Sequence, residues 1–323
     1  MIVLLWIGIG LAVVLLFAAI MPLVIPIPPM LNTRLPDQLA DPDSLFTQVN
    51  GLLIHYKDSS GDKPVIVLLH GFGASLFSFN AVAHTLAKKF RVIAFDRIGF
   101  GLSQRPTVGE WKTENPYSNQ SQVAILFGLL DQLGIGKATL VGHSAGGAIA
   151  IQAALQQPKR VSGLVLEDTA VFNQGHGFSG GMKFLLDTPQ AVRIMPYLIR
   201  RLLTNGNTFI GKAWHAPERI TEETFEFYKR PLQIDGWDRA LFEFTRAERS
   251  PITDNQLITL SLPVLVISGD DDQFIPPRDS EKLAKQIPLA QLVLCKDCGH
   301  IPHEEKPEEF MNATIPFLQT LNQ

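Results

Sequence analysis

The chain has 323 residues, of which 46% are hydrophobic and 18% are charged, and its mean hydropathy of +0.13 excludes a largely disordered protein. Its 28 basic and 31 acidic side chains leave a net charge of −3, with no dense Lys/Arg cluster. This balance lacks the electrostatic footprint of a nucleic-acid-binding protein. We therefore expect a small-molecule or lipid partner and no nucleic acid.

The amino terminus is the most apolar part of the chain. Residues 1–20 contain no ionisable side chain, and the apolar run continues to Ile27. About 20 apolar residues match the roughly 30 Å hydrocarbon core of a bilayer, so residues 1–27 are predicted to be a single-pass transmembrane anchor. A cleaved secretory signal is the alternative, but its apolar region is usually about 7 to 15 residues long and follows a basic leader. The first basic residue here is Arg34, which does not settle the orientation of the anchor.

A proline-rich linker, residues 28–44, follows the anchor. The prolines from Pro22 to Pro36 are expected to form a stiff, extended spacer that lifts the next domain off the bilayer. The folded domain then begins with FTQVNGLLIHYK, in which two alternating apolar stretches flank Asn50 and Gly51, a pair favoured in tight hairpin turns.

Short apolar runs alternate with helical patterns through residues 45–172 and again through residues 251–323. This alternation predicts an α/β core with a mostly parallel sheet and helices on both faces. The expected buried strands are residues 65–69, 91–95, 138–142, 163–167, 264–268 and 291–295; the expected helices are residues 79–88, 121–133, 145–156, 279–286 and 307–321.

Between the two parts of the core, residues 173–250 lack strand patterns and contain amphipathic helical segments, among them MKFLLDT, AVRIMPYLIRRLL and TEETFEFYKR. We interpret this region as an inserted helical cap over the sheet edge where the loops gather. The segment Ala191–Leu203 has more apolar surface than one helix face needs, interleaved with three arginines. It is expected to pack on the core, to line an acyl pocket, or to touch the bilayer.

The pentapeptide GHSAG, residues 142–146, lies between a predicted strand and a predicted helix. In that setting, GxSxG is typical of a nucleophile elbow, a strained turn that needs glycine two residues to either side of the serine. Ser144 is therefore the candidate nucleophile. A glycine-rich turn without catalytic function is the alternative.

A serine nucleophile needs a base to take its proton and an acid to orient that base. Asp272 follows the late strand VLVIS, and His300 follows the last strand, which is the chain order expected with a GxSxG elbow. Asp168, one strand earlier, is a rival acid, whereas Asp270 and Asp271 are more typical of turn residues. The other seven histidines are expected to have packing, surface or cap positions.

Acyl transfer also requires two backbone N–H groups directed at the developing oxyanion. One is expected from Ala145 in the elbow and the other from Phe72 in the loop HGFG, residues 70–73. The two cysteines, Cys295 and Cys298, form a CxxC, but an apolar run leads into the pair and no helix pattern follows directly, which disfavours redox chemistry. The sequence predicts no metal site and no cofactor.

Five motifs in register, LLHGFG, FDRIGFGLS, GHSAGG, GDDDQFIP and CGHIPHEEKPEEF, make residues 45–322 resemble the α/β-hydrolase superfamily of esterases, lipases and carbon–carbon bond hydrolases with a helical cap. The resemblance implies Ser144 as nucleophile, Asp272 as acid and His300 as base, with the amides of Phe72 and Ala145 as oxyanion hole. It also implies that Asp96 and Arg97 brace the site.

The expected function is a membrane-anchored serine hydrolase that cleaves carboxylic esters with an apolar acyl or alcohol part. Hydrolysis of a carbon–carbon bond in a diketone-like substrate uses the same triad and is one alternative. A hydrolase-like ligand receptor that signals through its cap is another. The physiological substrate, the acyl chain length and the oligomeric state are not predicted.

Overall fold

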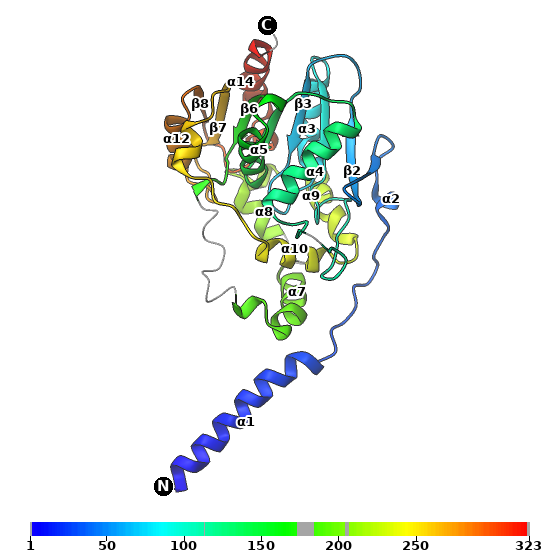
Figure 1. Ribbon diagram of the computed structural model, residues 1–323, viewed down its shortest axis with the longest axis vertical. Helices are drawn as coiled ribbons and strands as arrows, with labels where there is room; N and C mark the ends of the chain where they lie inside the picture. Colours follow the sequence, from blue (N-terminus) through cyan, green and yellow to red (C-terminus); the bar gives the residue numbers. More distant parts are fainter. Residues whose placement is uncertain (1, 113, 173–183, 204–206, 322–323) are drawn as a thin grey trace.

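The computed structural model describes residues 2–112, 114–172, 184–203 and 207–321 (Figure 1). Within these ranges, eight strands form one sheet in the order β1-β2-β4-β3-β5-β6-β7-β8. β1 and β2 pair antiparallel, as do β2 and β4, and all other neighbours are parallel. The strands are β1 Leu45–Val49, β2 Leu52–Asp58, β3 Val65–Leu69, β4 Arg91–Phe95, β5 Ala138–His143, β6 Val161–Glu167, β7 Val264–Gly269 and β8 Ala290–Cys295.

Every predicted strand and the predicted hairpin are confirmed. Val49 of β1 pairs with Leu52 of β2 across a two-residue turn, in which Asn50 and Gly51 have φ values of 53° and 79°. The central strands are buried along nearly their whole length, β5 and β7 at every position, because helices cover both faces of a parallel sheet. The mostly parallel α/β fold expected from the sequence is thus confirmed.

Two clusters of buried apolar side chains lie between the sheet and its helices, one on each face of the sheet. One cluster joins the sheet to α4 (Asn119–Gln132), α5 (Ala145–Gln156) and α12 (Pro277–Gln286). The other joins the opposite face to α3 (Asn80–Ala87) and α14 (Pro307–Thr320). The short helices α2 (Pro36–Leu39), α11 (Asp254–Ile258) and α13 (Pro302–Glu305) complete this part of the chain. The Ser118 hydroxyl caps α4 by accepting a hydrogen bond from the Ser121 amide.

Of the described helices between β6 and β7 in the chain, four lie together at one end of the sheet (Figure 1). They are α7 (Pro189–Leu203), α8 (Asn207–Ala213), α9 (Glu222–Lys229) and α10 (Trp237–Arg246), and we refer to them as the cap. α7 packs against α10. Residues 173–183, where the predicted cap begins, lie outside the described residues, so the boundaries at 173 and 250 stay a prediction.

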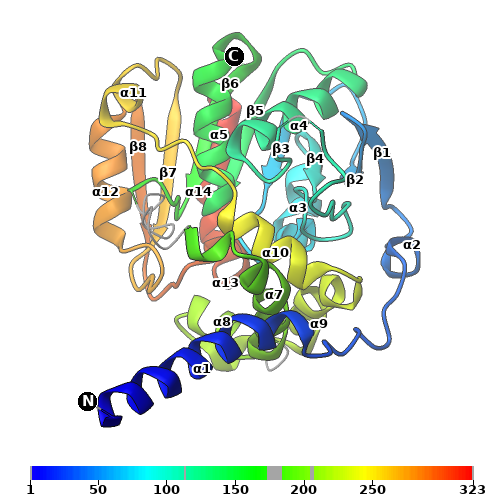
Figure 2. The ribbon, with the colours of Figure 1, turned by 60° about the horizontal axis from the view of Figure 1, so that its bottom comes forward.

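The amino-terminal helix α1 (Ile2–Val24) projects from the cap end of the molecule (Figures 1 and 2). It is long and apolar enough to cross a membrane: residues Leu5–Val24 have a mean hydropathy of 2.7, and none of that span is buried. Pro22, which was expected in the spacer, lies inside α1. Its missing N–H removes one helical hydrogen bond at the end of the helix without terminating it.

The linker after α1 does not keep the cap away from the helix. Side chains of α7 donate hydrogen bonds to carbonyl oxygens in and just after α1: Gln190 to Ala19 at 2.9 Å, Arg193 to Ile25 at 3.0 Å and Arg200 to Pro28 at 2.6 Å. The end of the apolar helix therefore contacts the cap, whereas the expectation that the linker lifts the domain off a bilayer stays a prediction. A stiff linker can run alongside the cap as well as away from it, and the cap offers donors that the backbone carbonyls accept.

Candidate active site

Ser144 sits on a strained turn between β5 and α5. Its backbone has φ 51° and ψ −117°, a conformation that costs free energy for any residue other than glycine. The Ser144 amide donates to the Glu167 carbonyl at 2.8 Å, which ties the turn to the end of β6. The serine is 8% exposed, so its hydroxyl stands at the edge of the sheet with little solvent around it.

The glycines on either side of Ser144 lie so close to neighbouring atoms that a Cβ would not fit at these positions. A Cβ on Gly146 would lie 2.2 Å from the Leu69 carbonyl oxygen, and one on Gly142 would lie 2.5 Å from the Gly147 Cα. A Cβ on Gly147 would lie 2.2 Å from the Thr169 hydroxyl oxygen. α5 thus approaches the sheet closely enough that any side chain at these positions would displace the backbone.

His300 and Asp272 form a hydrogen-bonded pair near the carboxyl ends of β7 and β8. His300 Nδ1 lies 2.7 Å from Asp272 Oδ2, and the other carboxylate oxygen accepts from the amides of Phe274 and Ile275 at 2.7 and 3.0 Å. The Asp272 side chain is fully buried. With Nδ1 engaged, the free ring nitrogen of His300 is Nε2, the atom that a serine nucleophile would need.

Asp168, the alternative candidate for the acid, lies beside this pair but accepts hydrogen bonds from other groups. Its carboxylate accepts from the Ser268 hydroxyl at 2.6 Å and from the Gly269 amide at 3.3 Å. Burial, together with the nearby charge of Asp272, holds the pKa of Asp168 well above its usual range. Of the two acids, it is Asp272 that hydrogen-bonds to the histidine ring.

The loop after β3 presents the second amide expected for an oxyanion hole. His70 Nδ1 donates to the Gly71 carbonyl at 2.8 Å, and His70 Nε2 accepts from the Arg97 amide at 3.1 Å. Burial lowers the pKa of His70 to about 3, so the ring stays neutral and keeps both contacts. Among the described residues, none accepts a hydrogen bond from the amides of Phe72 or Ala145.

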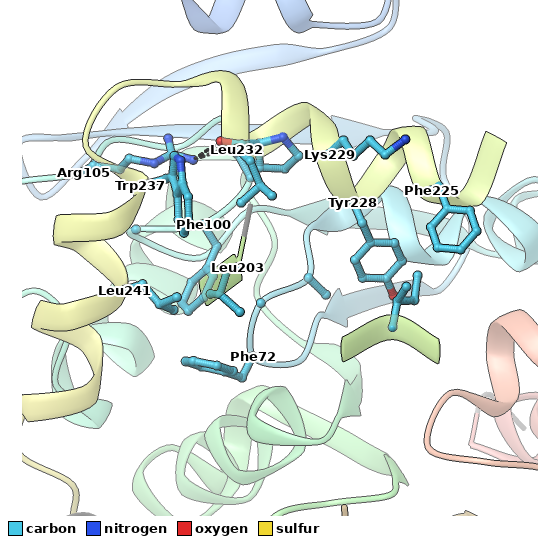
Figure 3. Close-up of a pocket in the computed structure, with 16 residues that line it drawn as sticks. Phe72, Phe100, Arg105, Leu203, Phe225, Tyr228, Lys229, Leu232, Trp237 and Leu241 are labelled. Atoms are coloured by element: carbon cyan, nitrogen blue, oxygen red, sulfur yellow. Dashed lines mark hydrogen bonds between the residues drawn. The ribbon is translucent and has the colours of Figure 1, made fainter. Parts of the chain in front are cut away.

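Two adjoining cavities give access to these residues. A cavity of about 120 Å³ is lined by Ser144, His300, Phe274 and neighbouring apolar side chains. A larger one, of about 490 Å³, shares Phe72, Ala74, Ile210 and Tyr228 with it. Figure 3 shows Tyr228, Leu232 and Trp237 of the cap on one side of the larger cavity and Phe72 on the other. The space can therefore hold an extended apolar group beside Ser144.

Behind His300, buried ionisable residues join the core to the cap, and the sequence reasoning missed their role. His303 Nδ1 lies 2.7 Å from Glu167 Oε2. Burial lowers the pKa of His303, but the Glu167 carboxylate outweighs this effect and the net shift is upward. Tyr228 of α9 donates to Glu304 at 2.8 Å. The motif HIPHEE places Glu304 close to His300 in the chain, but nothing in the sequence indicates Tyr228 as its partner.

Further contacts fix the backbone of His300 itself. Its amide donates to the Ala213 carbonyl of the cap at 2.6 Å, and its carbonyl accepts from His143 Nε2 at 2.8 Å. Glu305 accepts from the amides of Gly299 and His215. The segment of residues 299–305 thus fixes the positions of both His300 and the part of the cap at residues 213–215.

Asp168, Asp272 and His300 are the described residues that could offer ligands to a metal ion, since one ligand atom from each lies within 4.8 Å of the others. The Asp272–His300 contact and the donors to Asp168 already use these atoms. A metal ion would have to displace these hydrogen bonds, so the arrangement fits an acid–histidine pair better than a metal site.

Comparison with known proteins agrees with this geometry. Residues 64–307 match the α/β-hydrolase fold family. An uncharacterized hydrolase of Bacillus subtilis, YugF, is 30% identical over 87% of this chain and 100% of its own length. A 2-hydroxy-6-oxononadienedioate/2-hydroxy-6-oxononatrienedioate hydrolase of Burkholderia vietnamiensis is 29% identical over 83% of this chain and 91% of its own. A thermophilic esterase of Thermogutta terrifontis superposes with a TM-score of 0.70 at 27% identity, covering 87% of this chain and 99% of its own. With this match over most of its length and an eight-stranded sheet of the same fold, the chain belongs to the α/β-hydrolase family and is a hydrolase.

Proposed function

We propose that the protein is a membrane-anchored serine hydrolase that cleaves carboxylic esters with an apolar acyl or alcohol part. The observation that carries the proposal is the placement of Ser144 and the Asp272–His300 pair around one small cavity that adjoins a larger, mainly apolar one. The apolar, exposed helix α1 supports the anchor.

In the proposed mechanism, His300 Nε2 takes the proton of the Ser144 hydroxyl as its oxygen attacks the ester carbonyl. The amides of Phe72 and Ala145 stabilise the oxyanion. His300 then gives the proton to the leaving alcohol, and an acyl-enzyme forms. A water molecule, activated by the same nitrogen, hydrolyses it. Asp272 holds the imidazole in the required tautomer throughout.

Carbon–carbon bond hydrolysis is the second candidate, because the Burkholderia relative is named for a dienedioate substrate. Such a substrate has two carboxylates. The cations that line the larger cavity are Arg105 and Lys229. Arg105 donates to the carbonyls of Gly101, Ser103 and Pro231, and Lys229 pairs with Glu226. The Arg105 guanidinium keeps a buried Nε without a partner, so one carboxylate could be bound there, but most of the side chains that line this cavity are apolar, which favours an apolar ester.

Ser144→Ala tests the proposal and also separates an enzyme from a receptor. Turnover of p-nitrophenyl butyrate by the detergent-solubilised protein should fall by a factor of about 10⁴, and labelling by a fluorophosphonate should be lost. Ser261→Ala, at an exposed serine, is the matched control and should change neither. A wild-type protein that turns over a dienoate diketone but no ester would support the carbon–carbon reaction, and one that turns over neither would support the receptor.

A further inference from the structure

The charged residues of α7 are all basic, and the helix exposes large apolar side chains. The helix contains Arg193, Arg200 and Arg201 and no acidic residue, in a chain whose net charge is −3. Leu198 is 42% exposed and Leu202 is 75% exposed, and they lie four residues apart on one helix face. Just before α7, Phe184 and Leu185 are also exposed, at 73% and 59%. A helix with exposed leucines and arginines is typical of a membrane interface.

The contacts between α7 and α1 place this helix at a defined depth. Gln190 bonds to the carbonyl of Ala19, five residues before the end of α1, and a helix rises 1.5 Å per residue, so the contact is about 8 Å inside that end. Arg193 and Arg200 bond to carbonyls just beyond it. If α1 spans the bilayer, α7 lies beside its last turns, at the boundary of the headgroups and acyl chains. Figure 2 shows α1 and α7 at the same end of the molecule.

We propose that α7 is an interfacial helix, inserted through Leu198 and Leu202 into the leaflet around the carboxyl-terminal end of α1, where Arg193 and Arg201 bind anionic lipid headgroups. The partner is thus an anionic bilayer surface. The proposal also names the substrate class, ester lipids of that same leaflet, and in this respect it rests on the proposed function.

The larger cavity connects this surface to the catalytic residues. Leu203, the last residue of α7, lines that cavity together with Leu232 and Leu241. Figure 3 shows Leu203 beside Leu241, above Phe72. An acyl chain that leaves the leaflet along α7 would remain in contact with apolar side chains until it reaches the small cavity beside Ser144. Lateral entry would spare the chain most of its exposure to water.

A fluorescent label measures the depth of α7 independently of hydrolysis. The full-length protein, labelled at Leu198→Cys or at Leu289→Cys, is reconstituted in phosphatidylcholine vesicles containing 20% phosphatidylglycerol and lipids with a nitroxide on the acyl chain. Leu289 is also exposed but precedes β8, at the sheet edge away from the cap. We expect quenching at position 198 and none at position 289. Equal, weak quenching at both positions would overturn the proposal, even if the protein proves not to cleave esters.

Substitutions then test the entry of substrate. Leu198→Glu with Leu202→Glu should lower the hydrolysis of a long-chain ester lipid in vesicles by about tenfold or more, while turnover of soluble p-nitrophenyl butyrate changes less than twofold. Leu289→Glu with Leu294→Glu, on exposed leucines away from the cap, should change neither rate. Unaltered vesicle activity in the α7 variant would refute lateral entry. Dissociation of a dimer by that variant, together with no quenching of the label at position 198 in the otherwise unchanged protein, would assign the face to a second copy instead.

The role of the α7 arginines is tested by changing the anionic lipid content of the vesicles. Wild-type activity on the ester lipid should rise when phosphatidylglycerol replaces part of the phosphatidylcholine, and Arg193→Gln with Arg201→Gln should abolish this rise. Lys88→Gln with Lys89→Gln removes the same charge from the exposed end of α3 and should preserve it. If both pairs respond alike, a general charge effect replaces the specific role of α7.

Discussion

Glu304 joins the core to the cap through its hydrogen bond with Tyr228, and its carboxyl is predicted to make folding stability depend on pH. Its side chain is 6% exposed, and its Oε2 has no hydrogen-bond partner among the described residues. Burial raises the pKa of Glu304 from 4.5 to about 7, although His303 and Tyr228 act in the opposite direction. The folded protein therefore keeps a proton that the unfolded chain loses at lower pH.

Glu304→Gln tests this shift, because it removes the group that titrates and so changes how the free energy of unfolding depends on pH. The gap between pKa values of 4.5 and about 7 corresponds to about 3 kcal/mol, at 1.36 kcal/mol per pKa unit. In the wild type this stability is fully present below pH 4.5 and is lost as pH rises through 7. Glutamine keeps an oxygen that accepts from Tyr228 and has no charge to bury. The variant should therefore gain up to about 3 kcal/mol over the wild type between pH 5 and pH 8.

Urea unfolding of the full-length protein in detergent, followed by tryptophan fluorescence at pH 5, 6, 7 and 8, measures the two free energies of unfolding. Glu308→Gln, at an exposed glutamate in the first turn of α14, is the matched control and should follow the wild type. His303 keeps Glu167 as its partner in all three proteins, but the Glu304 charge also raises the pKa of His303 from 3.9 Å away, so the difference between wild type and Glu304→Gln includes this coupling. Parallel pH curves for wild type and Glu304→Gln would refute the assignment of the raised pKa to this carboxyl.

Two further substitutions test the triad acid and the elbow. Asp272→Asn should lower kcat by a factor of about 10⁴ because the His300 tautomer is lost, whereas Asp168→Asn, at a residue bonded to Ser268 and Gly269 and not to the His300 ring, should lower it less than tenfold; the reverse ranking in steady-state assays would assign the acid to Asp168. Gly146→Ala should destabilise the fold by about 3 kcal/mol in thermal unfolding, because its Cβ meets the Leu69 carbonyl. Gly136→Ala, with open space around it, should be close to neutral, and equal losses would contradict the contact argument.

The positions of the strands along the chain could be predicted because a strand buried in a parallel sheet has a recognisable local sequence. Each central strand is a short run of apolar residues bounded by polar or glycine residues, and the elbow glycines follow from a turn that admits no Cβ. The positions after β5, β7 and β8 then meet at one edge of the sheet. That placement is why the sequence alone identifies Ser144, Asp272 and His300 as candidates.

The contacts of the cap could not be predicted in the same way. Tyr228 and Glu304 are 76 residues apart, and neither differs in sequence from an ordinary amphipathic helix residue or a surface acid. The bonds from α7 to Ala19 and Ile25 depend on how the cap lies on the sheet, which helical periodicity does not specify. Local patterns define elements and turns, whereas the pairing of long polar side chains across elements depends on tertiary packing.

The contacts of His300 restrict where the cap can move. Its amide bonds to the Ala213 carbonyl, and Glu305 binds the amides of His215 and Ala216, so residues 213–216 cannot leave the core without breaking contacts of His300 and its neighbours. Side chains of α7 bond instead to Ala19 in α1, to Ile25 and Pro28 just after it, and to Asp238 of α10. A displacement of α7 would therefore leave these contacts of His300 in place. Substrate would then enter on the side of the cavity lined by Leu203, which is also the side on which α1 leaves the domain.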